Sequence, residues 1–173
     1  IGSSEFGEAF TFSYDLPNDT IYGETCAAIG LVFFARRMFE LTRDSKYIDV
    51  MERAIYNGVI SGMSLDGTSF FYVNPLEVDP VACERDFRKS HVKPVRQKWF
   101  GCACCPPNLA RLLSSITGYA YETDQTALYM NLFVGGSIRT EIQDQPVSLE
   151  VATRYPWEEL VTVTVKEAPA ASG

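Results

Sequence analysis

Hydrophobic residues recur at three- and four-residue steps through two early segments of the chain. Residues 23–42 and residues 46–61 are each predicted to form an amphipathic helix. Only Arg43, Asp44 and Ser45 separate them, so we expect an antiparallel hairpin with Asp44 or Ser45 as the second N-cap. The predicted core stripe of the first helix is Ala27, Leu31, Phe34, Met38 and Leu41, and that of the second is Tyr47, Val50, Met51, Ala54, Ile55 and Val59.

The period of the pattern changes later in the chain. Residues 69–73 are predicted to be a strand, residues 77–98 a polar surface loop, and residues 107–121 a third helix. Short strands over residues 127–134, 137–142, 147–153 and 160–165 then indicate the start of an antiparallel β domain, with a boundary near residues 123–126. The single histidine, His91, lies in the polar loop, where a solvated side chain is the common case, so we assign it no role.

The composition limits the classes of partner that the chain is expected to bind. The 173 residues carry a net charge of -7, which argues against nucleic acid and anionic membranes, since both attract basic surfaces. No run approaches the roughly 18 apolar residues of a membrane span. The first residue is Ile1, so we expect a part of a longer protein, and the clustered, odd number of cysteines favours a reducing compartment such as the bacterial cytoplasm.

The cysteines gather where a helix is predicted to begin. Cys102, Cys104 and Cys105 directly precede Pro106 and Pro107, and proline suits the first turn of a helix. The N–H groups and positive dipole end of a helix favour thiolate over thiol. Cys104 and Cys105, which would lie at that helix start, are therefore candidates for metal ligation or nucleophilic attack.

Glu24 and Cys26 open the first helix in a similar way. Residues two apart diverge on a regular helix, so both could reach one atom only from irregular backbone at the helix start. If the two helix starts meet, three thiolates and one carboxylate would suit tetrahedral zinc. Buried free cysteines, which are common core residues, explain the same pattern, and both interpretations stay open.

Glu8 is a carboxylate among apolar neighbours. In such packing its pKa would be raised and it could donate a proton. A solvated loop carboxylate is the commoner case.

Six ordered motifs resemble the β-L-arabinofuranosidases of glycoside hydrolase family 127. They are FGEAF at 6–10, DLPNDT at 15–20, ETCA at 24–27, ERAIYN at 52–57, FFYVNPL at 70–76 and CACCPPN at 102–108. The resemblance extends to about Val134, and the later strands match only in general character. It implies a mixed fold: part of an (α/α)6 barrel over residues 1–123 and the beginning of a β-sandwich over 124–167. From their position at the end of the chain, residues 168–173 are expected to be a disordered tail.

The resemblance also implies a site. Zinc would be held by Glu24, Cys26, Cys104 and Cys105; Cys104 would be the nucleophile that forms a glycosyl thioether, and Glu8 the general acid/base. Tyr72 and Glu52 are candidate substrate contacts, although a core aromatic residue and an ion pair with Arg53 are the simpler interpretations. Cys83 and Cys102 match no ligand position.

The function that the resemblance implies is that of a zinc-dependent retaining glycoside hydrolase acting on β-L-arabinofuranosides. Its substrate would be a small molecule or an oligosaccharide, and the full-length protein is expected to be a homodimer. An (α/α)6 barrel needs about a dozen helices, so the 173 residues alone should be inactive. A structural zinc module, a sugar-binding helical scaffold, and a mechanism with Glu8 and Glu24 as two carboxylates are the alternatives.

Overall fold

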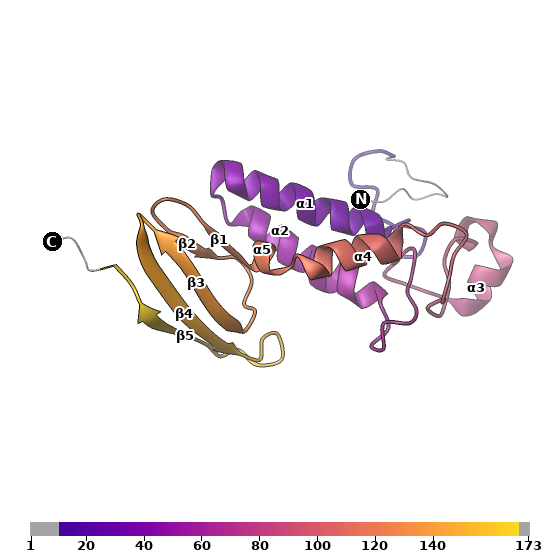
Figure 1. The fold of residues 1–173 in the computed structure, drawn as a ribbon. Helices are drawn as coiled ribbons and strands as arrows, with labels where there is room; N and C mark the ends of the chain where they lie inside the picture. Colours follow the sequence, from indigo (N-terminus) through magenta and orange to yellow (C-terminus); the bar gives the residue numbers. More distant parts are fainter. Residues whose placement is uncertain (1–10, 170–173) are drawn as a thin grey trace. The chain divides into compact units, whose positions relative to one another are not determined.

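A computed structural model describes residues 11–169 (Figure 1). The chain divides into two compact units, Ile1–Leu113 and Ser114–Gly173. The first is helical and the second carries antiparallel sheets, which confirms the predicted mixed class. Within residues 11–169, no helix has both the length and the apolar character needed to cross a membrane.

The predicted helical hairpin is present. Helix α1 (Thr25–Thr42) packs against α2 (Lys46–Ala54), and Ser45 is the N-cap of α2 (Figure 1). In place of a regular helix to residue 61, α2 is followed by a π-helical turn, Ile55–Val59, and a 3-10 turn, Ile60–Gly62. Gly58 allows this turn to lie directly on α1, because a Cβ there would be 2.8 Å from the Cβ of Ala28.

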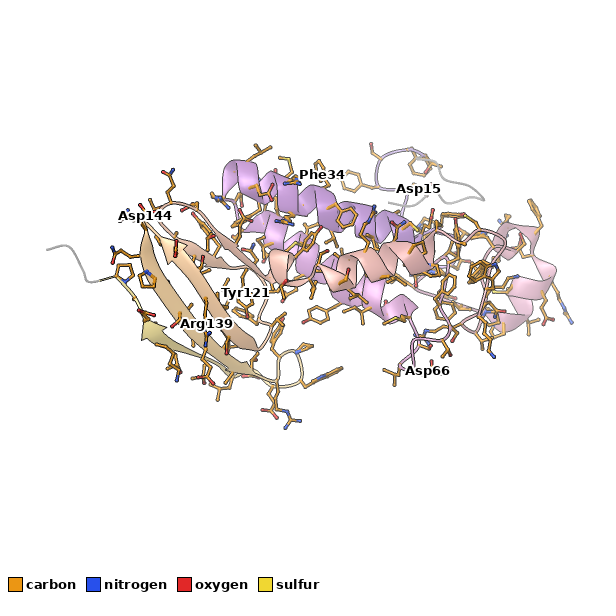
Figure 2. The ribbon with its side chains drawn as sticks, in the orientation of Figure 1. Asp15, Phe34, Asp66, Tyr121, Arg139 and Asp144 are labelled. Atoms are coloured by element: carbon orange, nitrogen blue, oxygen red, sulfur yellow. The ribbon has the colours of Figure 1, made fainter. Side chains whose placement is uncertain are left out.

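The predicted core stripe of α1 is wrong. The buried residues are Thr25, Ile29, Val32, Ala35 and Phe39. Two members of the predicted stripe are instead exposed: Phe34, which projects outward from α1 in Figure 2, at 59%, and Leu41 at 80%. Residues 27–35 are apolar nearly all round the helix, so periodicity does not identify the inward face. For the second predicted helix the stripe is buried at Met51 and Ala54 of α2 and at Ile55 and Val59 of the π-helical turn, but Val50 is exposed.

The segment predicted as a polar loop contains a short helix. Helix α3 (Pro80–Arg85) begins with the Asp79 side chain accepting hydrogen bonds from the N–H groups of Val81 and Ala82, and a 3-10 turn, Phe87–Lys89, follows. Lys89 forms an ion pair of 2.7 Å with Asp19. Six residues without a buried position leave little periodic signal, which is why the helix was missed.

Backbone pairing joins the start of α1 to residues 72–74. Thr25 N–H donates to the Tyr72 carbonyl at 2.9 Å, and Asn74 N–H donates to the Gly23 carbonyl at 3.0 Å. Gly23 has φ of +46°, and a Cβ there would lie 3.1 Å from the Asn74 carbonyl oxygen, so glycine is required. The predicted strand over residues 69–73 thus forms isolated bridges rather than a continuous sheet.

The third predicted helix is divided. Helix α4 (Cys105–Ser114) is followed by a short helix, α5 (Thr117–Ala120). Strands β1 (Tyr121–Thr123) and β2 (Leu128–Met130) then pair antiparallel, and Tyr121, the predicted last residue of the helix, is instead the first residue of β1.

A three-stranded antiparallel sheet completes the second unit. Its strands are β3 (Gly136–Ile142), β4 (Gln145–Thr153) and β5 (Val161–Glu167), in the order β3-β4-β5 (Figure 1). The β3–β4 turn has positive φ at Gln143 (53°) and Asp144 (58°), as a two-residue type I′ turn requires. Val147 and Val151 of β4 are buried, and because they are four residues apart they lie on the same face of the sheet.

Thr25 offers a test of the pairing between α1 and residues 72–74. Its side chain is fully buried; its hydroxyl donates to the Phe71 carbonyl at 2.8 Å and accepts from Asn74 Nδ2 at 2.9 Å. Thr25→Val keeps the shape of the side chain but removes the hydroxyl, which leaves both of its partners without this hydrogen bond. We therefore expect the free energy of unfolding to fall by about 1–3 kcal/mol in urea titrations. Thr42→Val, at the exposed end of the same helix, is the matched control and should change it by less than about 0.5 kcal/mol. Equal effects of the two variants would contradict the assignment.

Candidate metal centre

The four predicted ligands lie at, or directly before, the starts of two helices. Glu24 is the N-cap of α1, with extended φ and ψ of -62° and 137°, and its carboxylate makes no capping hydrogen bond. Cys26 lies in the first turn of α1. Cys104 directly precedes α4, and Cys105 is the first residue of α4. Neighbouring side chains can therefore converge here, as they could not in mid-helix.

The structure brings these four side chains together. One oxygen of Glu24 and the sulfurs of Cys26, Cys104 and Cys105 all lie within 4.8 Å of one another. The Cys26 and Cys105 sulfurs are 3.7 Å apart, and those of Cys104 and Cys105 are 3.9 Å apart. The Cys104 thiol donates to Glu24 Oε1 at 3.5 Å.

Three of the six distances within the cluster match those of a tetrahedral zinc site. Zn–S bonds of about 2.3 Å and a Zn–O bond of about 2.1 Å at tetrahedral angles separate two sulfurs by about 3.8 Å and a sulfur from the oxygen by about 3.6 Å. The two sulfur–sulfur contacts and the sulfur–oxygen contact are within about 0.1 Å of these values. Three thiolates and a carboxylate are also a donor set that suits zinc.

Burial outweighs the helix start in setting the protonation of the sulfurs. It raises the pKa of the Cys104 thiol to about 12, although a hydrogen bond with Tyr72 opposes the shift. Burial also raises the pKa of the Cys105 thiol. The lowered pKa expected from the helix N-terminus is therefore not found at these two residues in the metal-free protein. Zinc would bind the thiolates and release their protons.

Tyr72, predicted as a substrate contact or a core aromatic residue, lies against the cluster. Its hydroxyl oxygen is 3.4 Å from Cys104 Sγ. That hydrogen bond, followed by burial, raises the pKa of Tyr72, so the phenol keeps its proton. The ring packs against Phe100 with centroids 5.7 Å apart, and edge-to-face against Tyr22 at 6.3 Å. Tyr72 is thus both a packed aromatic residue and a hydroxyl group directed at the nucleophile candidate.

The other candidates lie elsewhere. Glu52 is half-buried on α2 and is not part of the four-residue cluster; within residues 11–169 no ion pair joins it to Arg53. Glu8 lies outside the described residues. Cys83 is half-buried on α3, and Cys102 is exposed. His91, expected in solvent, is half-buried and stacks on Tyr22 at 5.5 Å, and burial lowers its pKa.

Sequence reasoning gave no role to two residues of α4. Asn108 Nδ2 donates to Cys26 Sγ at 3.2 Å, and Arg111 donates to Asn108 Oδ1 at 2.6 Å. The spacing offered a signal, since Cys105, Asn108 and Arg111 follow one another at three-residue steps and share one face of a helix.

The raised thiol pKa values predict how stability depends on pH. Unfolded cysteine titrates near 9.0 and folded Cys104 near 12, so between these values the unfolded chain loses its proton first. We expect the free energy of unfolding of the metal-free, reduced protein to fall as the pH rises from 9 towards 12, in urea titrations at fixed ionic strength. Cys104→Ala should make this fall smaller, whereas Cys83→Ala should leave it unchanged. Constant or rising stability over that range would contradict the burial of the thiols.

Two family models match the chain. The model described as β-L-arabinofuranosidase, GH127 catalytic domain, matches residues 1–118, and the GH127 middle domain matches residues 127–172. Comparison with individual proteins identifies the same family. A non-reducing end β-L-arabinofuranosidase of Bifidobacterium longum subsp. longum is 43% identical over 168 residues, which is 95% of this chain and 25% of that protein.

Solved structures give the same result. A GH127 β-L-arabinofuranosidase from Geobacillus stearothermophilus T6 superposes with a TM-score of 0.90 at 62% identity, over 96% of this chain and 26% of that one. A GH127 β-arabinofuranosidase superposes with a TM-score of 0.86 at 42% identity, over 97% of this chain and 25% of that one. The chain thus spans about a quarter of the length of these relatives, and it belongs to the β-L-arabinofuranosidase family, glycoside hydrolase family 127.

Proposed function

We propose that this chain contributes the metal-binding part of a zinc-dependent retaining glycoside hydrolase that acts on β-L-arabinofuranosides. The observation that carries the proposal is the convergence of Glu24, Cys26, Cys104 and Cys105 within 4.8 Å in a member of this family. The relatives named as arabinofuranosidases are about four times as long, so the activity belongs to a longer protein. In that protein, residues 1–123 would form part of an (α/α)6 barrel and residues 124–167 the beginning of a β-sandwich.

Among the three clustered cysteines, Cys104 is the best candidate for the nucleophile. Cys105 is fully buried, so a sugar cannot reach its sulfur. Cys26 is half-buried and its sulfur accepts a hydrogen bond from Asn108. Cys104 is half-buried and faces the Tyr72 hydroxyl, a group that can donate to a sulfur anion or to a sugar oxygen.

The reaction would proceed through two displacements. In the first, Cys104 Sγ forms a bond to the anomeric carbon while the bond from that carbon to the leaving oxygen breaks, and Glu8 gives its proton to that oxygen. In the second, Glu8 takes a proton from water, whose oxygen bonds to the anomeric carbon as the carbon–sulfur bond breaks and its electron pair returns to sulfur. Two inversions retain the configuration, as in two-carboxylate retaining enzymes.

The remaining cluster residues would hold the zinc ion and orient the Cys104 sulfur. When bound, zinc supplies the charge that keeps Cys104 deprotonated at neutral pH, against the burial that raises its pKa. Glu24, Cys26 and Cys105 would hold the ion. Tyr72 would orient the sulfur.

A cavity beside Glu24 does not extend to the nucleophile candidate. It measures about 360 Å³, and its lining includes Glu24 before α1, Arg53 on α2 and Asn57 in the π-helical turn. Neither Cys104 nor Tyr72 lines it, so we do not assign the sugar to this cavity. Glu52 does not line it either, and its role as a substrate contact stays a prediction.

Further properties belong to the same proposal. The substrate would be a small molecule or an oligosaccharide that ends in β-L-arabinofuranose, as the names of the relatives suggest. We place the full-length protein in the bacterial cytoplasm as a homodimer.

A structural zinc site is the second candidate function. Four protein ligands would fill a tetrahedral shell, and structural zinc sites are closed in this way. Glu24 and Cys105 are both buried, which favours it. Such a site would hold zinc without forming a bond to any sugar.

Trapping the covalent intermediate tests the nucleophile. The intact full-length protein is treated with an arabinofuranose-configured, mechanism-based inactivator, digested and mapped by mass spectrometry. We expect one sugar adduct on the peptide of Cys104, and none in Cys104→Ser. Cys83→Ser, which alters a cysteine on α3, is the matched control and should still be labelled at Cys104. An adduct on Glu24 would support the two-carboxylate mechanism, and absence of any adduct in a zinc-loaded protein would support the structural site.

Replacement of Glu8 tests the acid/base assignment. Glu8→Gln cannot exchange a proton, so we expect turnover of a poor leaving group to fall by about 10²–10⁴-fold. The kcat/KM of an activated aryl glycoside, which reports only the first displacement, should be less affected, because its leaving oxygen needs little protonation. Glu5→Gln, three residues earlier, is the control and should be near wild type. Unchanged turnover of the poor leaving group in Glu8→Gln would show that another group transfers the proton.

A further inference from the structure

We propose that Asn108 and Arg111 are positioning residues for the metal centre, in which Arg111 fixes the Asn108 amide so that its N–H is directed at the sulfur of Cys26. This inference rests on the zinc site of the proposed function and extends it beyond the four ligands.

A continuous series of contacts leads from α4 to the cluster. Asn108 Nδ2 lies 3.2 Å from Cys26 Sγ, and an Arg111 guanidinium nitrogen lies 2.6 Å from Asn108 Oδ1. The guanidinium carbon of Arg111 lies 4.8 Å from the ring centroid of Phe33 on α1. Cys26 is also on α1, so the series of contacts begins and ends on the same helix.

Arg111 determines which way the amide faces. An amide has one accepting side and one donating side, whereas guanidinium only donates. The oxygen of Asn108 must therefore face Arg111, and the NH₂ group must face the sulfur. Without Arg111 the amide could turn and present its oxygen to a thiolate, which would be repulsive.

The N–H suits a sulfur that carries negative charge. A hydrogen bond from a neutral amide stabilises a thiolate and holds its side chain in one rotamer without adding charge. Partners of this kind around ligands typically change metal affinity by about 10–100-fold. The Asn108 side chain donates to Cys26, whereas its backbone N–H donates to the Cys104 carbonyl at 3.3 Å at the start of α4. The side-chain amide therefore has no part in the proposed reaction other than its contact with the cluster.

Two substitutions and their combination test the inference. Asn108→Leu keeps the branched shape and removes the N–H, and Arg111→Met keeps much of the aliphatic stem and removes the guanidinium. The dissociation constant for zinc is measured by chelator competition at fixed pH on the intact, reduced protein. Asn57→Leu, an exposed asparagine whose Nδ2 donates to the Arg53 carbonyl, is the matched control.

We expect zinc affinity to fall about 10–100-fold in Asn108→Leu and by less in Arg111→Met, with no change in Asn57→Leu. Because Arg111 acts through Asn108, the double variant should bind zinc as Asn108→Leu does. A cobalt-substituted sample gives a second readout: loss of the N–H raises the energy of the sulfur electrons, so the sulfur-to-cobalt absorption should move to longer wavelength.

Three results would overturn the inference. They are wild-type affinity in Asn108→Leu, multiplied rather than equal effects in the double variant, and an unshifted cobalt absorption. If Asn108→Leu does not fold, as judged by circular dichroism, Arg111→Met and Asn108→Ala carry the same comparison. Failure of the wild-type protein to bind zinc would instead overturn the proposed zinc site, together with this inference, and so is distinguishable from the other outcomes.

Discussion

The backbone pairing of residues 23–25 with residues 72–74 is the constraint on which the site depends. It sets Glu24 at the N-terminus of α1 with an extended backbone, and it places Tyr72 beside Glu24. The fully buried Thr25 hydroxyl closes the pairing by bonding to the Phe71 carbonyl. Because Glu24 is thereby excluded from the regular helix, its carboxylate can face the cysteines that approach from α4.

The cost of burying the thiols gives the cluster its chemical character. Burial opposes ionisation and raises the pKa of Cys104 and Cys105, although both lie at the start of a helix. The partial charge of a helix end is smaller than a full ionic charge, and here it does not compensate for lost hydration. A divalent cation can compensate, and the sulfur–sulfur distances of 3.7 and 3.9 Å already match its coordination shell. The metal and the fold would therefore stabilise each other.

Local signals in the sequence marked the helix starts that carry the cluster better than they predicted the packing. The cysteines followed by Pro106 and Pro107 marked the start of α4, and the loop at residues 43–45 marked the helical hairpin. Their convergence on Glu24 came from family resemblance, since no spacing along the chain specifies it. The prediction of the inward face of α1 was wrong because both faces of the helix are apolar. Helix α3 is too short to show a helical period of hydrophobic residues. Asn108 was overlooked because its contact with Cys26 spans 82 positions in the sequence.

X-ray absorption at the zinc edge tests the central claim most directly, that one zinc ion is held by Glu24, Cys26, Cys104 and Cys105. On the zinc-loaded protein we expect a first shell of three sulfurs at about 2.3 Å and one oxygen at about 2.0–2.2 Å. A shell of four sulfurs would replace Glu24 with another cysteine. A shell of oxygen and nitrogen alone would mean that the cysteines do not bind the metal, and the account of the site would be wrong.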